Sequence, residues 1–478
     1  AKRPIPSGIA LIRSRKHSLC EDVVVFVKYL PLPLFILFAS SVFAAPQFSG
    51  VQQALPAPEA AVLRWQPAQG RGNITYRIYQ KERNGWNREP VAEVKNITEW
   101  PLVDLEGGRS YEFLVRAKDS TGEDKNTKTV TVTPTSNYPS EEWRAVWFTR
   151  FEWPGGSKQQ VQNRIRQALG ALGDGNFNAV IFQVRGQGDT LYPSKDEPWS
   201  HLLTASARTF DPVAFAIDEA HKNGLEFHAW INLSTIWQSG DHQRPGDRQH
   251  PFYKFADARS PETRTGLIHD AQGNPQQWGS DEYVWLTPGN PKVNAYLRKQ
   301  VMDFLKTHEV DGLHWDDRTG NPHFPSRDPI SVERFKGSGN PMKTRDFGEW
   351  QHDQLDRMLT RIYVQAKAIQ PDLLITASPF GIADKSRIND YYRFSDAFGF
   401  GVRPETWAKK GIVDALTPQI YWNLDEYPPS RPNYAQLVRD WMAHNETGIP
   451  IWPGSNLRSG QDLLPWQQRN AAYCRAVG

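Results

Sequence analysis

From residue 142 to the end of the chain, two kinds of apolar pattern alternate. Short segments are apolar throughout or alternate every second residue, as β-strands do, and longer segments between them place apolar residues three or four apart, as amphipathic helices do. The predicted strands are 144–149, 179–185, 226–232, 312–316, 374–378, 415–421 and 450–453. The predicted helices are 159–172, 212–222, 291–307 and 347–369. Strands that alternate with helices pair into a parallel sheet.

Seven such strands, joined by loops of very unequal length, favour a (β/α)8 TIM barrel for residues 140–478 over an open doubly wound sheet. The first strand leads into Trp147-Phe148-Thr149-Arg150-Phe151 without the glycine-rich phosphate loop of nucleotide-binding folds. An eighth strand is hard to identify, because only 25 residues follow Pro453 and 461–478 has little strand character. We interpret the barrel as incomplete at the C-terminus, either open or, our preferred interpretation, truncated.

Residues 56–134 show an all-β pattern instead. Several short segments alternate between apolar and polar residues, and turn residues separate them, including Gly70-Arg71-Gly72-Asn73. The predicted strand regions are 61–65, 75–79, 105–117 and 127–133. Several strands at short spacing predict a β-sandwich that precedes the barrel, and no catalytic constellation stands out within it.

Residues 1–45 have the features of an export signal with an upstream segment. The apolar stretch 29–43 follows Lys28 and ends in Val42-Phe43-Ala44, with small residues where signal peptidase cleaves. The stretch is shorter than the ~20 residues of a membrane span, so we favour a cleaved signal over an uncleaved anchor. Residues 1–26 are interpreted as upstream of the signal. We therefore expect an exported protein, periplasmic or extracellular, in a bacterial envelope.

Composition narrows the function further. The formal charge of +3 arises from a net +4 in residues 1–45 and −1 in the remainder, so the body of the protein has no basic signal for nucleic acid. The only cysteines are Cys20 and Cys474, which predicts neither an intramolecular disulfide nor a cysteine metal cluster. The 18 tryptophans suit sugar stacking, although tryptophan more often fills a core.

The predicted fourth strand ends in two carboxylates, Asp316 and Asp317, where the catalytic face of an α/β barrel lies. Neighbouring strand residues point to opposite faces, so parity directs Asp316 into the barrel mouth and leaves Asp317 on the rim, where it either acts in catalysis or satisfies backbone N–H groups. The same parity selects polar and aromatic residues on neighbouring strands for substrate binding. These are Gln183, Arg185, His228, Trp230, Asn232, His314, Gln419 and Tyr421, with Trp147 as a stacking wall. The two histidines lack a metal-ligand spacing, so no metal and no cofactor is predicted.

Several motifs in order identify a resemblance to a known family. They lie at 143–153, 182–185, 191–194, 219–230, 285–291, 310–317, 378–381 and 418–422. Together they resemble the glycosyl-hydrolase-like family 10, and residues 56–134, through Trp65 and Tyr111, resemble a fibronectin type III domain. The first resemblance implies a TIM barrel that cleaves peptidoglycan glycan strands, notably strands stripped of stem peptides. The family usually has an aromatic residue after the paired aspartates, where this chain has Arg318.

The resulting hypothesis is a glycoside hydrolase whose partner is a polysaccharide, most simply peptidoglycan glycan strands. Asp316 is expected to be the essential nucleophile or base, and a second carboxyl group must protonate the leaving oxygen. The candidates for that group are Asp317, Glu405, Asp425 and Glu426. The alternative is a non-catalytic glycan-binding protein on the same scaffold, and a metal-dependent hydrolase is a third hypothesis. The sandwich is expected to act as a spacer or adhesion module that contacts cell-envelope proteins.

Overall fold

The computed structural model describes residues 45–478 except seven short internal stretches. These stretches are 240–242, 258, 261–263, 342, 389–392, 426–430 and 457–463. The predicted signal segment and the candidate Glu426 therefore lie outside the described residues. No helix of the described part is long and apolar enough to cross a membrane.

The N-terminal region forms a β-sandwich of two antiparallel sheets, as the alternating pattern predicts. The first sheet has the order β1 (Val51–Ala57), β2 (Ala60–Trp65), β6 (Glu99–Leu102). The second contains β3 (Thr75–Glu82), β4 (Gly85–Trp86), β5 (Ala92–Lys95), β7 (Tyr111–Asp119), β8 (Gly122–Glu123) and β9 (Thr129–Val132). Trp65 is buried and donates to the carbonyl of Ile97 at 3.0 Å. The Tyr111 hydroxyl accepts from the Glu106 backbone N–H at 2.8 Å, as a tyrosine corner does.

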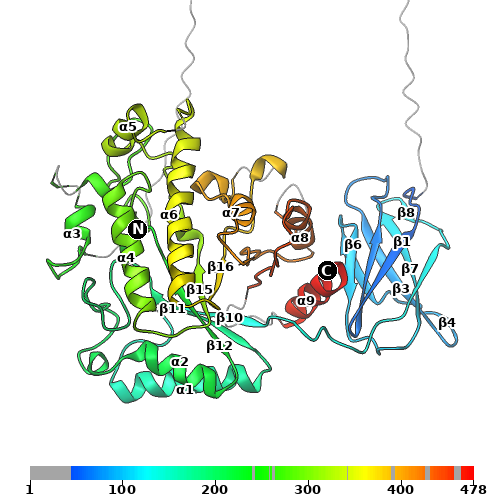
Figure 1. Cartoon of the computed structure of the whole chain (residues 1–478). Helices are drawn as coiled ribbons and strands as arrows, with labels where there is room; N and C mark the ends of the chain where they lie inside the picture. Colours follow the sequence, from blue (N-terminus) through cyan, green and yellow to red (C-terminus); the bar gives the residue numbers. More distant parts are fainter. Residues whose placement is uncertain are drawn as a thin grey trace, which may run out of the picture. The chain divides into compact units, whose positions relative to one another are not determined.

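The second region is built on a six-stranded parallel sheet, which confirms the predicted α/β pattern. Its strands, in spatial order, are β10 (Ala145–Phe148), β11 (Ala179–Arg185), β12 (Glu226–Ile231), β15 (Gly312–Trp315), β16 (Leu374–Ala377) and β17 (Ala415–Leu416). The larger helices are α1 (Lys158–Asp174), α2 (Pro212–Lys222), α4 (Pro291–Leu305), α6 (Phe347–Ile369), α8 (Tyr434–Ala443) and α9 (Leu464–Val477). In Figure 1, α1 packs beside α2, and α4 packs beside α6.

Shorter elements fill the connections. Two strands of the long insertion after β12, β13 (Thr235–Gln238) and β14 (Tyr283–Trp285), form an antiparallel pair. The remaining short helices are α3 (Phe252–Phe255), α5 (Pro329–Lys336), α7 (Pro404–Lys410) and the 3₁₀ turns η1 (Ala207–Thr209), η2 (Arg264–Gly266), η3 (Asp317–Thr319), η4 (Lys385–Arg387) and η5 (Phe398–Phe400).

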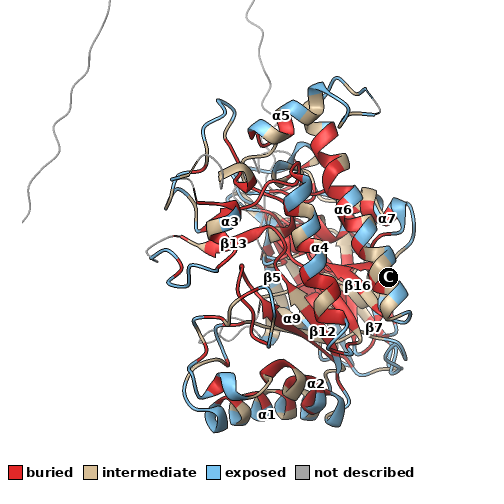
Figure 2. Cartoon of the chain, turned by 60° about the vertical axis from the view of Figure 1, so that its left-hand side comes forward, coloured by how far each residue is buried: buried red, intermediate tan, exposed pale blue. Residues whose placement is uncertain are grey.

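Local sequence explains where the helices start and which faces they bury. Ser157 and Gln160 form a reciprocal capping box at the start of α1, and Asp211 caps α2 just before a proline. The buried residues of α1 recur every fourth position, as one apolar stripe requires. All seven residues of β11 are buried, which is typical of a central parallel strand. Figure 2 shows this burial running along the sheet and the inner sides of the helices.

The sheet curls but does not close within the described residues. Within the predicted strand 415–421, only Ala415–Leu416 forms a continuous strand, and Gln419 makes a single parallel bridge to Phe380. The segment at the predicted strand 450–453 joins the sheet through single parallel bridges, from Ile451 to Leu416 and from Gly454 to Gln419. The Trp452 ring stacks on Trp143, next to β10, at 4.4 Å. No eighth strand pairs β10 with this segment in the described part, so the described strands form a curled half-barrel.

Candidate active site

A cavity of about 170 Å³ opens at the carboxyl ends of the parallel strands. Strand parity explains its composition, since polar and aromatic residues at these strand ends face inward together. Its walls are Trp147, Thr149, Phe151, Gln183, Trp230, Asn232, Tyr283, Asp316, Asp317, Arg318, Ser378, Gln419 and Tyr421. Eight of the eleven residues predicted from the sequence therefore meet here.

Asp316 lines this cavity and comes directly after β15. Its Oδ1 accepts from the Arg318 backbone N–H at 2.9 Å and so caps η3, whereas its Oδ2 has no hydrogen-bond partner among the described residues. The residue is only 4% exposed. Burial, reinforced by the neighbouring Asp317 charge, raises the pKa of Asp316 to about 7. A carboxyl group with this pKa holds a proton for much of the time near neutral pH.

Asp317 has the opposite environment. Its Oδ1 accepts from Arg318 Nη1 at 2.5 Å and from Gln419 Nε2 at 3.2 Å, so a cation and an amide stabilise its charged form. The same Arg318 Nη1 lies 3.7 Å from Asp316 Oδ2. The two carboxyl oxygens are therefore separated by at most the sum of these distances, about 6.2 Å. The pair combines one buried carboxyl group whose pKa is raised with one that is ion-paired to Arg318.

Aromatic and amide side chains form the walls around this pair. Trp230 donates through Nε1 to Asn232 Oδ1 at 2.7 Å, which fixes the indole at the cavity edge. Gln183 Nε2 reaches the same oxygen at 3.4 Å. Two aromatic rings are left open to solvent at the rim, Tyr421 at 46% and Phe151 at 60% exposure. Flat exposed rings beside amide groups are the combination that binds sugar faces and hydroxyls.

Three of the predicted binding residues do not line this cavity. Arg185 is buried and forms an ion pair with both oxygens of Glu197. His228 sits near the start of β12, where its Nε2 lies 3.1 Å from Glu226 and its ring meets the edge of Trp143. Arg185 was assigned to the wrong face, because a register shift after Gln183 pairs it with Ile231 and interrupts the period of two. His228 was assigned a face of the sheet but not a depth along it.

His314 does not line the cavity, but it hydrogen-bonds to Trp147, which does. Its Nε2 accepts from Trp147 Nε1 at 3.0 Å, so its Nδ1 carries the proton and donates to Thr376 Oγ1 at 2.7 Å. Burial lowers the pKa of His314 well below its usual value, which keeps this neutral tautomer. The histidine therefore orients the Trp147 ring.

The candidates for a second carboxyl group differ in whether they line the cavity. Asp317 lines the cavity, whereas Glu405 binds Arg387 at 2.6 Å outside it and Asp425 is not among the lining residues.

Sequence reasoning missed Thr149, Phe151, Tyr283, Arg318 and Ser378 as cavity residues. Tyr283 had no detectable signal, since it comes from β14 in the long insertion and packs at 5.3 Å over the Arg318 guanidinium. The described residues contain no cluster of three or more His, Cys, Asp or Glu side chains that could hold a metal ion.

Comparisons of the sequence with known proteins find similarity to glycosyl hydrolases. The sequence model of the glycosyl hydrolase-like 10 family matches residues 142–452. The chain is 26% identical over 329 residues to glycosyl hydrolase YngK of Bacillus subtilis, covering 65% of this chain and 59% of YngK. It is 26% identical over 346 residues to glycosyl hydrolase DigH of Escherichia coli K12, covering 64% of this chain and 71% of DigH.

A comparison of structures found the PgaB (BpsB) glycoside hydrolase domain from Bordetella bronchiseptica among the similar folds. The two are 14% identical with a TM-score of 0.48, and the match covers 65% of this chain and 83% of that domain. The chain spans about three fifths of the length of YngK.

Proposed function

Because the chain belongs to the glycosyl hydrolase-like 10 family, we propose that it hydrolyses O-glycosidic bonds of a polysaccharide. Family membership supports a role in acting on glycans, and the paired carboxyl groups support hydrolysis. The observation that carries the proposal is the environment of Asp316, a buried carboxyl group with a pKa of about 7 beside an ion-paired Asp317. A carboxyl group that holds a proton near neutral pH, beside a second, ion-paired carboxyl group, suits acid-assisted glycoside cleavage.

The environments of Asp316 and Asp317 assign a different catalytic role to each. Asp316 is the general acid, because it holds a proton near neutral pH and can donate it to the leaving glycosidic oxygen. This revises the sequence-based hypothesis, in which Asp316 was the nucleophile or base. Asp317 is the carboxylate, held by Arg318 and Gln419. A separation of at most about 6.2 Å supports attack by Asp317 itself, since retaining enzymes place their carboxyl groups about 5–5.5 Å apart and inverting enzymes ~6.5–9.5 Å apart.

The proposed substrate is the glycan strand of peptidoglycan, in an exported protein that acts in the bacterial envelope. The resemblance of the motifs to glycosyl-hydrolase-like family 10, which implies cleavage of peptidoglycan glycan strands, motivates this choice, and a rim with exposed Tyr421 and Phe151 is compatible with a long sugar chain. We further propose the (β/α)8 barrel as the architecture of the domain, a fibronectin type III relationship for the sandwich, and contact of that sandwich with cell-envelope proteins. These proposals extend beyond the family relationship itself.

The test is release of soluble fragments from purified glycan strands without stem peptides, followed by chromatography and mass spectrometry. Wild-type protein is expected to release sugar fragments, Asp316→Asn to lose that activity by at least a thousandfold, and Asp303→Asn to keep it. Asp303 is a matched control because it is a partly exposed aspartate on α4, remote from the cavity lining.

The alternative function is binding without cleavage. One observation favours it, because Arg318 neutralises Asp317 where the family usually has an aromatic residue. Co-sedimentation with sacculi, measured beside product release, separates the two functions. Sedimentation with no product from wild-type protein would replace hydrolysis by binding.

A further inference from the structure

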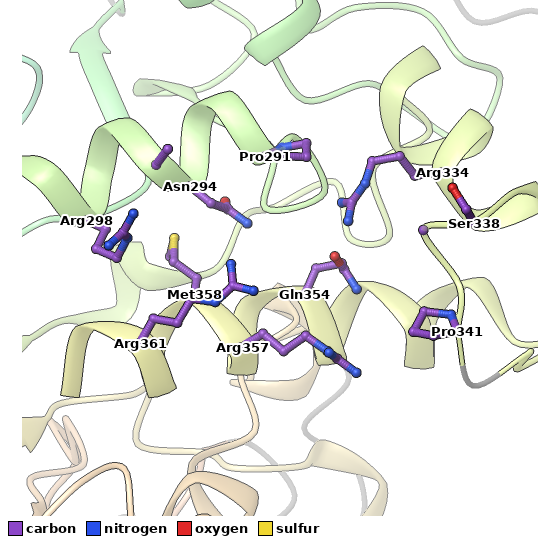
Figure 3. Close-up of a pocket in the computed structure, with 12 residues that line it drawn as sticks. Pro291, Asn294, Arg298, Arg334, Ser338, Pro341, Gln354, Arg357, Met358 and Arg361 are labelled. Carbon is purple, nitrogen blue, oxygen red and sulfur yellow. The ribbon is translucent and has the colours of Figure 1, made fainter. Parts of the chain in front are cut away.

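A second cavity lies away from the strand ends, between α4, α5 and α6 (Figure 3). Its volume is about 250 Å³. Four arginines line it, Arg298 from α4, Arg334 from α5, and Arg357 and Arg361 from α6, and no carboxylate is among the lining residues. Helix surfaces usually intersperse charges of both signs, so four cations around one hollow require an explanation.

Three of these guanidinium groups have no ion-pair partner among the described residues. Arg298 donates to the neutral Gln365 Oε1 at 2.9 Å. Arg334 donates to the Gly289 carbonyl at 2.5 Å and lies over the Trp350 ring. Arg361 has neither a hydrogen bond nor an ion pair with any described residue, whereas Arg357 binds Asp353 at 2.6 Å. The hollow therefore carries an excess of about three positive charges.

The arginines are close enough to act on one another. Burial lowers the pKa of Arg334, Asp328 raises it, and the charges of Arg357 and Arg361 lower it further. Like charges held this near repel one another and destabilise the fold, and the attraction of each arginine to a bound anion would offset this repulsion. The remaining walls supply small and polar groups, including Asn294 in the first turn of α4, where the helix dipole also favours an anion.

We propose that this cavity is a binding site for a compact polyanion with two phosphoryl groups. A cavity of ~150 Å³ can hold benzene, which has six non-hydrogen atoms, so a volume of about 250 Å³ suits a diphosphate of nine non-hydrogen atoms. Each phosphoryl group carries about −1.5 to −2 charges at pH 7, so a diphosphate balances the excess of three. The guanidinium fork matches phosphoryl oxygens in pairs, which explains arginine rather than lysine at all four positions.

This site is independent of the proposed glycan chemistry. The cavity at the strand ends and the arginine cavity share no lining residue. Failure of glycan cleavage would leave the anion site untouched, and failure of anion binding would leave the cleavage proposal untouched.

Isothermal titration with inorganic pyrophosphate, without divalent metal, tests the proposal on the full chain. Wild-type protein is expected to bind one equivalent, with affinity that falls as salt rises. Arg361→Gln and Arg298→Gln are each expected to weaken binding about tenfold, and Arg166→Gln, a half-exposed arginine on α1, to leave it unchanged. Absence of binding, or equal weakening by all three substitutions, overturns the proposal. Arg361 and Arg298 make no ion pair that folding would lose, and unchanged melting temperatures verify this.

A second arm identifies the source of the diphosphate group. Flotation with vesicles of phosphatidylcholine containing 5% of a diphosphate lipid is compared with flotation on phosphatidylcholine alone. Flotation that requires the diphosphate lipid and is lost in Arg361→Gln supports a lipid headgroup as the ligand. Pyrophosphate binding without flotation supports a soluble diphosphate. Flotation that Arg361→Gln leaves intact, with no pyrophosphate binding, contradicts the site.

Discussion

Replacing Arg318 with glutamine is expected to raise the pKa of Asp316 above its value of about 7. Arg318 Nη1 lies 3.7 Å from Asp316 Oδ2, and a positive charge at that distance favours the ionised carboxylate. At this distance two unit charges interact by about 1 kcal/mol in water and about 4.5 kcal/mol at an effective dielectric constant of 20. At 1.36 kcal/mol per pKa unit, loss of the charge raises the pKa by roughly one to three units. Removing Arg318 also leaves the Asp317 charge unscreened, which acts in the same direction.

The assay is a ¹³C NMR titration of the aspartate carboxyl carbons, which does not depend on knowing the substrate. Asp316→Asn identifies the resonance, and Arg318→Lys serves as the control that keeps the charge and is expected to shift the midpoint by less than one unit. The reasoning is refuted if Asp316 titrates below pH 5 in the wild-type protein. An unchanged or lowered midpoint in Arg318→Gln would equally refute it.

Three further predictions concern stability and binding. Because the pKa of Asp316 is raised, its contribution to stability is fully present below about pH 4 and is lost as pH rises through about 7. Asp316→Asn should therefore be more stable than wild type at pH 8 by up to about 4 kcal/mol, and little changed at pH 4. Equal unfolding midpoints in urea at pH 8 would contradict the burial of Asp316 as the cause. Glu197→Gln leaves the Arg185 charge buried without its ion pair, which should cost about 3 kcal/mol in urea unfolding, and a loss below 1 kcal/mol would mean that the pair is replaceable. Tyr421→Ala removes an exposed stacking ring and should raise KM for glycan strands about threefold to tenfold with little change in kcat; a fall in kcat alone would assign the tyrosine to the chemical step.

Much of the candidate site was predictable because strand geometry is local. A period of two along 179–185 and 226–232 places Gln183, Trp230 and Asn232 on one face, and Asp316 follows in register two strands away from β11. Parallel strands end together, so these side chains had to converge. The cavity they form follows from pairing and period alone.

The features of the site that the sequence did not predict depend on contacts between distant residues, which no local pattern encodes. A register shift between Gln183 and Arg185 interrupts the period of two, and Arg185 is buried against Glu197, a loop residue twelve positions later. Tyr283 reaches the cavity from the insertion after β12, whose path is set by tertiary packing. The protonation of Asp316 is likewise invisible in the sequence, because desolvation arises only once the walls have assembled.

The incomplete barrel illustrates the same limit. Residues 450–454 contain two prolines and a glycine and pair only through isolated bridges, since proline cannot donate to a strand ladder. The composition predicted a strand there, and the structure retains its position beside β17 but not a continuous ladder.

The most direct test of the central claim is the hydrolysis of purified peptidoglycan glycan strands by wild-type protein and by Asp316→Asn at pH 6. At this pH, Asp316 with a pKa of about 7 is mostly protonated, as a general acid must be. We expect soluble sugar fragments from the wild type and a loss of at least a thousandfold in the variant. Undiminished hydrolysis by Asp316→Asn would contradict the assignment of Asp316 as the acid.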